Sequence, residues 1–279
     1  MGLSFGSFLQ FAVIGVLGYI LAGAPLRSLL SPTPTSERPN VLPFHAKKSL
    51  VIPDKDLNCP KHDYTVHLLA REPLVIYIEN FLSGDEARHV VEMSEPRFKP
   101  STVWTKGIER LDDKVRKSEK AQLDRDDVVK CIEERARTFQ GWQANVFIEK
   151  LWSQRYGPSG HYRHHYDWST STSTSGRISS FMVYLEANCT GGGTNFPRIK
   201  KPNHETWCRF IECGNEDGEE GWDGVTFKPI AHNAVFWENL RSDGSGYTES
   251  WHAGLPVKSG TKIGLNIWSW YQKGYTPEA

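Results

Sequence analysis

The second half of the chain constrains the fold most strongly. From residue 141 onward, short aromatic and β-branched runs alternate with clusters of Gly, Ser, Asn and Pro. Such runs are typical of β-strands, and such clusters are typical of the turns between them. Helical patterns are confined to the first half, so we expect an α+β fold in which helices pack on a β-sandwich or β-barrel.

Three elements of the first half can be placed. A strand is predicted at Leu74–Ile78, where β-branched residues dominate. The capping box Ser83-Gly-Asp-Glu86 predicts a helix from Ser83 to Met93. A second helix is predicted over Asp124–Thr138, because acidic residues fill its first turn and apolar residues share one face.

The N-terminus is predicted to be a membrane segment. Residues 8–26 (FLQFAVIGVLGYILAGAPL) carry no charge and are long enough to cross a hydrocarbon core. We expect residues 1–28 to form a transmembrane signal-anchor, with a signal peptide cleaved near Ala24 as the alternative. Basic residues that follow the span oppose a lumenal orientation of the rest of the chain, whereas the sequon Asn188-Cys189-Thr190 favours one.

Composition narrows the possible partners and the domain limits. Six prolines between residues 29 and 62 predict an extended stem, which leaves residues 63–279 as the folded domain. Lys plus Arg equals Asp plus Glu at 33 each, so the basic excess typical of a nucleic-acid-binding protein is missing and no nucleic-acid partner is expected.

The five cysteines contain no Cys-x-x-Cys pair. A Cys208–Cys213 disulfide across a short turn remains open.

One segment carries a candidate metal site. His165 and Asp167 are two residues apart, and on a strand such side chains point to the same side. They would supply two of the three ligands of a 2-His-1-carboxylate site for Fe(II), with His252 as the distant third. Taken alone, the His-x-Asp pair is more simply explained as ordinary polar residues of a surface loop.

A candidate anion-binding lysine follows His252. Lys258-Ser-Gly260 is predicted to be a turn and residues 261–270 a strand that places Lys262, Gly264, Asn266 and Trp268 on one face. A lysine on an enclosed face needs an anionic partner, because burying an unpaired ammonium is costly. The distal carboxylate of a 2-oxo acid would satisfy this requirement. The alternative is an ordinary exposed lysine.

From about residue 73 to residue 270 the chain resembles the prolyl 4-hydroxylase family of Fe(II)- and 2-oxoglutarate-dependent dioxygenases, especially its membrane-anchored members. The resemblance rests on Glu79-Asn-Phe-Leu-Ser83, the HxD run, Arg177-Ile-Ser-Ser-Phe-Met-Val-Tyr-Leu185, Gly192-Gly-Thr-Asn-Phe-Pro197, and HAGLPV followed by G-x-K. It implies a double-stranded β-helix (jelly-roll, cupin-like) core with N-terminal helices packed on it. The chain departs from the family pattern at His161 and His164, where Gln and Pro are usual. His161 has the strand parity of His165 and is a weak alternative ligand.

The resemblance also implies roles for individual residues. His165, Asp167 and His252 would hold the iron, and Lys262, Tyr156 and Tyr184 would bind 2-oxoglutarate. Tyr162, Arg177 and Trp268 would border the peptide groove, although each aromatic residue is also compatible with core packing.

The implied reaction is peptidyl-prolyl 4-hydroxylation coupled to decarboxylation of 2-oxoglutarate, with O2 and L-ascorbate. The implied location is the endoplasmic reticulum membrane, with a lumenal catalytic domain. The alternatives are the same chemistry on a free amino acid or small molecule, or a non-catalytic membrane-tethered binding module. The oligomeric state does not follow from the sequence.

Overall fold

The computed structural model describes residues 50–54, 56–105, 108–142, 146–169, 171, 175–214 and 222–272. The predicted anchor at 1–28 and the stem up to residue 49 lie outside these residues. Within the described ranges, no helix is long and apolar enough to cross a membrane.

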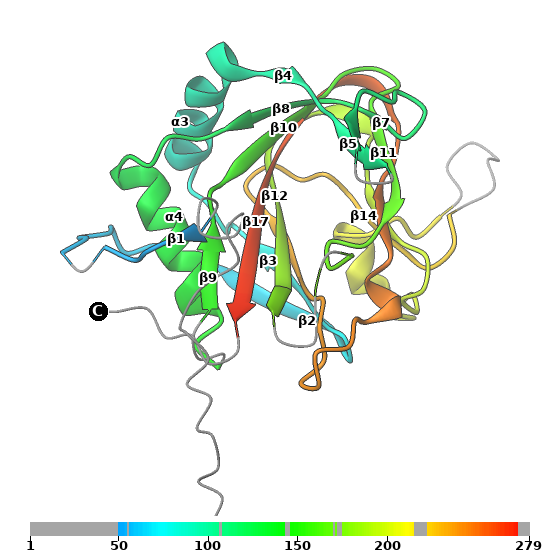
Figure 1. Ribbon diagram of the computed structural model, residues 1–279. Helices are drawn as coiled ribbons and strands as arrows, with labels where there is room; N and C mark the ends of the chain where they lie inside the picture. Colours follow the sequence, from blue (N-terminus) through cyan, green and yellow to red (C-terminus); the bar gives the residue numbers. More distant parts are fainter. Residues whose placement is uncertain are drawn as a thin grey trace, which may run out of the picture. The chain divides into compact units, whose positions relative to one another are not determined.

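Two antiparallel β-sheets build the folded part (Figure 1). The larger, ten-stranded sheet has the order β2-β3-β15-β12-β17-β10-β8-β4, with β9 also beside β17 and β1 beside β9. Its strands are β1 Leu50–Val51, β2 Thr65–Arg71, β3 Leu74–Glu79, β4 Lys99–Pro100, β8 Glu119–Gln122, β9 Val146–Glu149, β10 Trp152–Tyr156, β12 Ser175–Gly191, β15 Ala234–Glu238 and β17 Val257–Gln272. We call it the major sheet.

The second, five-stranded sheet has the order β14-β13-β16-β11-β7, and we call it the minor sheet. Its strands are β7 Arg116–Lys117, β11 His161–His165, β13 Thr194–Phe196, β14 Val225–Phe227 and β16 His252–Gly254. A separate hairpin joins β5 Val103–Thr105 to β6 Ile108–Arg110, and short 3-10 turns lie at Glu95–Arg97, Glu205–Arg209 and Thr248–Ser250. This arrangement agrees with the expected jelly-roll core.

Alternation along the central strands separates two hydrophobic cores. On β12, Phe181 and Val183 face the helices, whereas Met182 and Tyr184 face the minor sheet. The helix-side core also contains Ile263, Leu265 and Ile267 of β17, which the sequence pattern assigns to one face. Their neighbours Lys262, Gly264 and Asn266 therefore face the space between the sheets.

The long strand β17 corrects one expectation. Residues 258–260 form no turn, because β17 continues through them and pairs with β12 as far as Val257 opposite Gly191. Gly260 has φ +77°, and a Cβ there would lie 2.0 Å from the Asn188 carbonyl oxygen. Glycine therefore allows a left-handed residue inside a strand, where the sequence pattern is typical of a turn.

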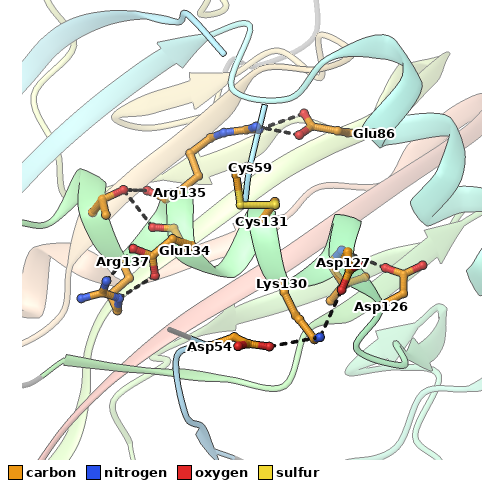
Figure 2. Close-up of a disulfide and its surroundings, with 12 residues drawn as sticks. Asp54, Cys59, Glu86, Asp126, Asp127, Lys130, Cys131, Glu134, Arg135 and Arg137 are labelled. Atoms are coloured by element: carbon orange, nitrogen blue, oxygen red, sulfur yellow. Dashed lines mark hydrogen bonds and ion pairs between the residues drawn. A yellow bond between two sulfur atoms is a disulfide. The ribbon is translucent and has the colours of Figure 1, made fainter. Parts of the chain in front are cut away.

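Two helices cover the outer face of the major sheet (Figure 1). Helix α3, Gly84–Ser94, begins at the predicted capping box, in which Ser83 and Glu86 cap each other. Helix α4, Asp127–Phe139, begins later than predicted, because the Asp126 side chain accepts a hydrogen bond from the Val129 amide and is its N-cap. Arg135 of α4 binds both carboxylate oxygens of Glu86, at 2.6 and 2.9 Å, and so joins the two helices (Figure 2).

Two disulfides are present, and the remaining cysteine, Cys189, has a free thiol. Cys208–Cys213 agrees with the bridge that the sequence leaves open. Cys59–Cys131 was not predicted, and it attaches the segment before β2 to helix α4 (Figure 2). Leu50 and Val51 also pair with β9. Leu50, Val51 and Cys59, which the sequence assigns to the stem, are therefore attached to the folded domain.

Replacing Cys59 and Cys131 together by serine is expected to lower the free energy of unfolding by about 4 kcal/mol. The bridge closes a sequence separation of 72 residues, and the entropy it removes from the unfolded chain grows with that length. Loss of Cys208–Cys213, with a separation of 5 residues, is expected to cost only about 2 kcal/mol. Denaturant unfolding of the two double variants provides the test, and an equal loss in both would contradict it.

Candidate metal centre

The two sheets bring three metal-ligating side chains together. His165 is the last residue of β11, Asp167 lies in the turn after it, and His252 begins β16. Strands β11 and β16 are neighbours in the minor sheet, and His165 lies opposite His252 in their register. The pairing of distant segments therefore creates the cluster.

The cluster has the dimensions of a metal site. The ligand atoms lie within 4.8 Å of one another, and no other group of three or more possible ligands occurs among the described residues. The Nε2 atom of His165 is 3.6 Å from Asp167 Oδ1, and that of His252 is 4.0 Å from Asp167 Oδ2.

Both imidazole rings are held by a backbone contact at Nδ1, which leaves Nε2 of each ring free. Nδ1 of His165 lies 2.8 Å from the Arg163 carbonyl oxygen, and Nδ1 of His252 lies 2.8 Å from the Ser250 carbonyl oxygen. Each Nδ1 therefore donates its hydrogen to the backbone, which leaves Nε2 as the lone-pair donor. Two imidazoles and one carboxylate without thiolate suit Fe(II), so the residues present fit this metal.

Electrostatics favour an ionised Asp167 carboxylate beside a neutral His252 imidazole. Burial raises the pKa of Asp167, but the adjacent His165 and His252 and the nearby Arg177 guanidinium outweigh it and hold the pKa well below its usual range. Burial and the neighbouring His165 lower the pKa of His252 to about 4. These are the protonation states that a divalent metal requires.

Strand β11 is irregular, and this decides which histidines face the site. A register shift between Tyr162 and His165 breaks the alternation, so Tyr162 stacks on His165 with ring centroids 3.8 Å apart. His161 is outside the ligand cluster, and its Nδ1 contacts the Ser159 carbonyl oxygen at 3.0 Å. The parity that made His161 an alternative ligand therefore does not hold. His164 contacts Asn195 Oδ1 at 2.9 Å, also outside the cluster.

Lys262 lies in the same cavity and is completely buried. Its Nζ donates to the Gly192 carbonyl oxygen and lies 4.7 Å from the ring centre of Tyr156, its register partner on β10. Among the described residues no acidic side chain forms an ion pair with it. Burial lowers its pKa to about 8. A buried ammonium beside a possible metal is a site for the far carboxylate of a chelating dianion.

The other tyrosines have different surroundings. Tyr156 lines the cavity, and its hydroxyl donates to Gln154 Oε1 at 2.7 Å. Tyr162 also lines it and lies under the Arg116 guanidinium. Tyr184 is buried between the sheets, and its hydroxyl donates to Thr194 Oγ1 at 2.8 Å. It reaches the cavity only through Thr194, which is a lining residue.

Arg177 and Trp268 lie beside the carboxylate. Arg177 forms a two-point ion pair with Glu149, at 2.7 and 2.9 Å, and lies 3.7 Å from the ring centre of Trp268. Trp268 Nε1 donates to Asp167 Oδ2 at 3.0 Å. Neither is free, so in this structure both support the metal ligand.

Several residues of the site were not singled out from the sequence. Gln154, Thr194 and Asn266 line the cavity, and Ser180 donates to Asp167. Strand parity provides a signal for two of them. Asn266 lies on the same strand face as Lys262, and Gln154 lies on the same strand face as Tyr156. Nothing local indicates Ser180 or Thr194, because their contacts are made between strands.

Comparisons with known proteins agree with this geometry. The model of the 2OG-Fe(II) oxygenase superfamily matches residues 151–270. This range contains the three metal-ligating residues and Lys262. Prolyl 4-hydroxylase subunit alpha-2 of Caenorhabditis elegans is 27% identical over 220 residues, which cover 75% of this chain and 36% of that protein. Prolyl 4-hydroxylase 5 of Arabidopsis thaliana is 28% identical over 213 residues, which cover 73% and 70%. The chain thus spans about a third of the animal subunit.

A solved structure gives the same result for the fold. The viral collagen prolyl hydroxylase of Paramecium bursaria Chlorella virus-1, in complex with 2OG, superposes with a TM-score of 0.53 at 26% identity. The match covers 71% of this chain and 96% of the viral one.

Proposed function

We propose that this chain is a prolyl 4-hydroxylase-type member of the 2OG-Fe(II) oxygenases, and that it hydroxylates prolyl residues of peptides at C4 with Fe(II), 2-oxoglutarate and O2. The observation that carries the proposal is Lys262, fully buried in one cavity with His165, Asp167 and His252. Bound Fe(II) supplies the oxygen chemistry, in which decarboxylation of 2-oxoglutarate to succinate drives hydroxylation.

The contribution of the chain is orientation and exclusion of water. His165, Asp167 and His252 would hold the metal, and the cavity that they share with Lys262 would receive the co-substrate. Lys262 and the Tyr156 ring would receive the far carboxylate of 2-oxoglutarate and so set the direction of its chelating end. Tyr162, stacked on His165, offers an aromatic face next to the reacting position, and such faces suit proline rings. The similarity to prolyl 4-hydroxylases supports the same substrate class.

The test uses the full chain with Fe(II), 2-oxoglutarate, O2 and ascorbate, which we propose as the reductant that maintains Fe(II). Proline-containing peptides are expected to gain the mass of one oxygen, with one succinate released per hydroxylation. Succinate without any peptide modification would direct the search to a free amino acid or small molecule. No succinate and no metal binding would refute the enzyme function and leave a binding module.

We also propose a lumenal location in the endoplasmic reticulum, with residues 1–28 as the anchor. The two disulfides support it, because disulfides persist in oxidising compartments. Asn188 supports it as well, since the side chain is exposed although it lies on β12.

In a eukaryotic cell, the full chain is therefore expected to carry an N-glycan at Asn188. Treatment with peptide N-glycosidase should increase its electrophoretic mobility, and the Asn188→Gln variant should run like the treated protein. A wild-type protein whose mobility does not change on treatment would contradict the lumenal location.

A further inference from the structure

A chain of buried hydrogen bonds ends on the carboxylate of Asp167. Trp237 Nε1 donates to Asn239 Oδ1 at 3.0 Å, and Asn239 Nδ2 donates to Ser180 Oγ at 2.9 Å. Ser180 Oγ then donates to Asp167 Oδ2 at 2.7 Å. Ser180 and Asn239 are fully buried and Trp237 nearly so, which keeps water from replacing any link.

The direction of this chain follows from its first member. An indole N–H can only donate, so the Asn239 atom that faces Trp237 must be the carbonyl oxygen. Its amide nitrogen is then the atom that faces Ser180 and donates to it. Because Ser180 already receives a hydrogen from Asn239, its single hydroxyl hydrogen is directed to the acceptor that remains, the ionised carboxylate.

Strand register explains why these residues meet. Ser180 on β12 lies opposite Trp237 on β15 and opposite Trp268 on β17. Trp268 Nε1 donates to the same oxygen, Asp167 Oδ2, at 3.0 Å. Three adjacent strands of the major sheet thus hold Oδ2 with two donors, while Oδ1 is directed to His165 Nε2, 3.6 Å away.

We propose that Ser180 and Asn239 are positioning residues for the metal: they fix the Asp167 carboxylate so that Oδ1 is the ligand and Oδ2 is held by the major sheet. The inference rests on the proposed function, since it assigns Asp167 to the metal. Asp167 follows strand β11 of the minor sheet, whereas Lys262 lies on β17 of the major sheet. The contact between Ser180 and Asp167 therefore also fixes the position of the metal relative to Lys262. Partners of this kind commonly change metal affinity by about 10- to 100-fold.

The test measures binding of Co(II) alone to the full chain by its visible absorption. Ser180→Ala is expected to weaken Co(II) binding by about 10-fold or more and to change the band pattern, because the carboxylate can rotate. Asn239→Ala should have a smaller effect in the same direction. In the Ser180→Ala background Asn239→Ala should cause no further loss, since Asn239 acts through Ser180.

Ser179→Ala is the matched control. Ser179 is the neighbouring buried serine, and its hydroxyl donates to Gln140 on the helix side of the sheet. It should lower the unfolding temperature of the metal-free protein about as much as Ser180→Ala while leaving Co(II) affinity unchanged. Wild-type affinity in Ser180→Ala, or fully multiplicative losses in the double variant, would overturn the inference. Failure of the wild type to bind Co(II) would instead refute the proposed function.

Discussion

His252→Ala is expected to reduce the proposed peptide hydroxylation by at least about 1,000-fold. The substitution removes one of three ligands, and a catalytic metal contributes several kcal/mol to transition-state stabilisation. His252 is almost completely buried, packed against Phe196 and Trp237, and among the described residues the cluster contains no further possible ligand. The measurement is succinate release together with the metal content of the purified variant.

His161→Ala is the appropriate control. His161 lies on the same strand as His165, four positions before it, but it is not part of the ligand cluster. The variant is expected to keep its metal and the three-ligand site. Loss of metal in His161→Ala, or full metal content and turnover in His252→Ala, would contradict the ligand set.

Lys262→Met is expected to raise the KM for 2-oxoglutarate by at least about 30-fold. Removing one partner of a buried charge pair commonly costs 2 kcal/mol or more, and a methionine cannot pair with the carboxylate. Lys258→Met, an exposed position on the same strand, is the control and should leave KM unchanged. Metal affinity should be normal in both variants, which separates loss of the co-substrate from loss of the metal.

The same substitution should stabilise the protein when 2-oxoglutarate is absent. Burial lowers the pKa of Lys262 to about 8 from 10.5, so the folded state binds this proton less tightly than the unfolded state does. The resulting destabilisation, at most about 3 kcal/mol, is fully present below pH 8. It disappears as the pH rises from 8 to 10.5, because the folded protein loses the proton first.

Lys262→Met should therefore unfold at a higher temperature than the wild type at pH 7, by a margin that shrinks toward pH 10.5. Addition of 2-oxoglutarate with Mn(II) should raise the unfolding temperature of the wild type more than that of the variant. An unfolding temperature for Lys262→Met below that of the wild type at pH 7 would show that the ammonium is already well compensated in the free protein.

Local sequence patterns predicted the elements with strong periodicity or caps. The capping box at Ser83 placed the start of α3 correctly, because cap and helix are adjacent in the chain. Alternation along residues 261–270 placed Lys262 on the face away from Ile263 and Leu265, as observed. The predicted start of the second helix was too early, since two aspartates, Asp124 and Asp126, precede it and only Asp126 makes the capping contact.

Features that depend on pairing between distant segments could not be predicted in this way. The Cys59–Cys131 bridge joins residues with a sequence separation of 72, and no local signal chooses among the possible cysteine pairs. The shift in β11 that excludes His161 depends on its partner strand β16. The turn expected at 258–260 is a strand because β12 offers a partner along its whole length.

For the site itself, the amino-acid sequence alone defines which chemical groups are available: two imidazoles and a carboxylate with metal-ligand spacing, and a lysine on an inward face. These follow from residue type and strand parity, which are local properties. Two features of the site appear only once the strands are packed: Nε2 is the free nitrogen of both histidines, and Ser180 and Trp268 hold one oxygen of Asp167. The physical reason is that a hydrogen bond between strands depends on their register, which is set by packing of the whole sheet.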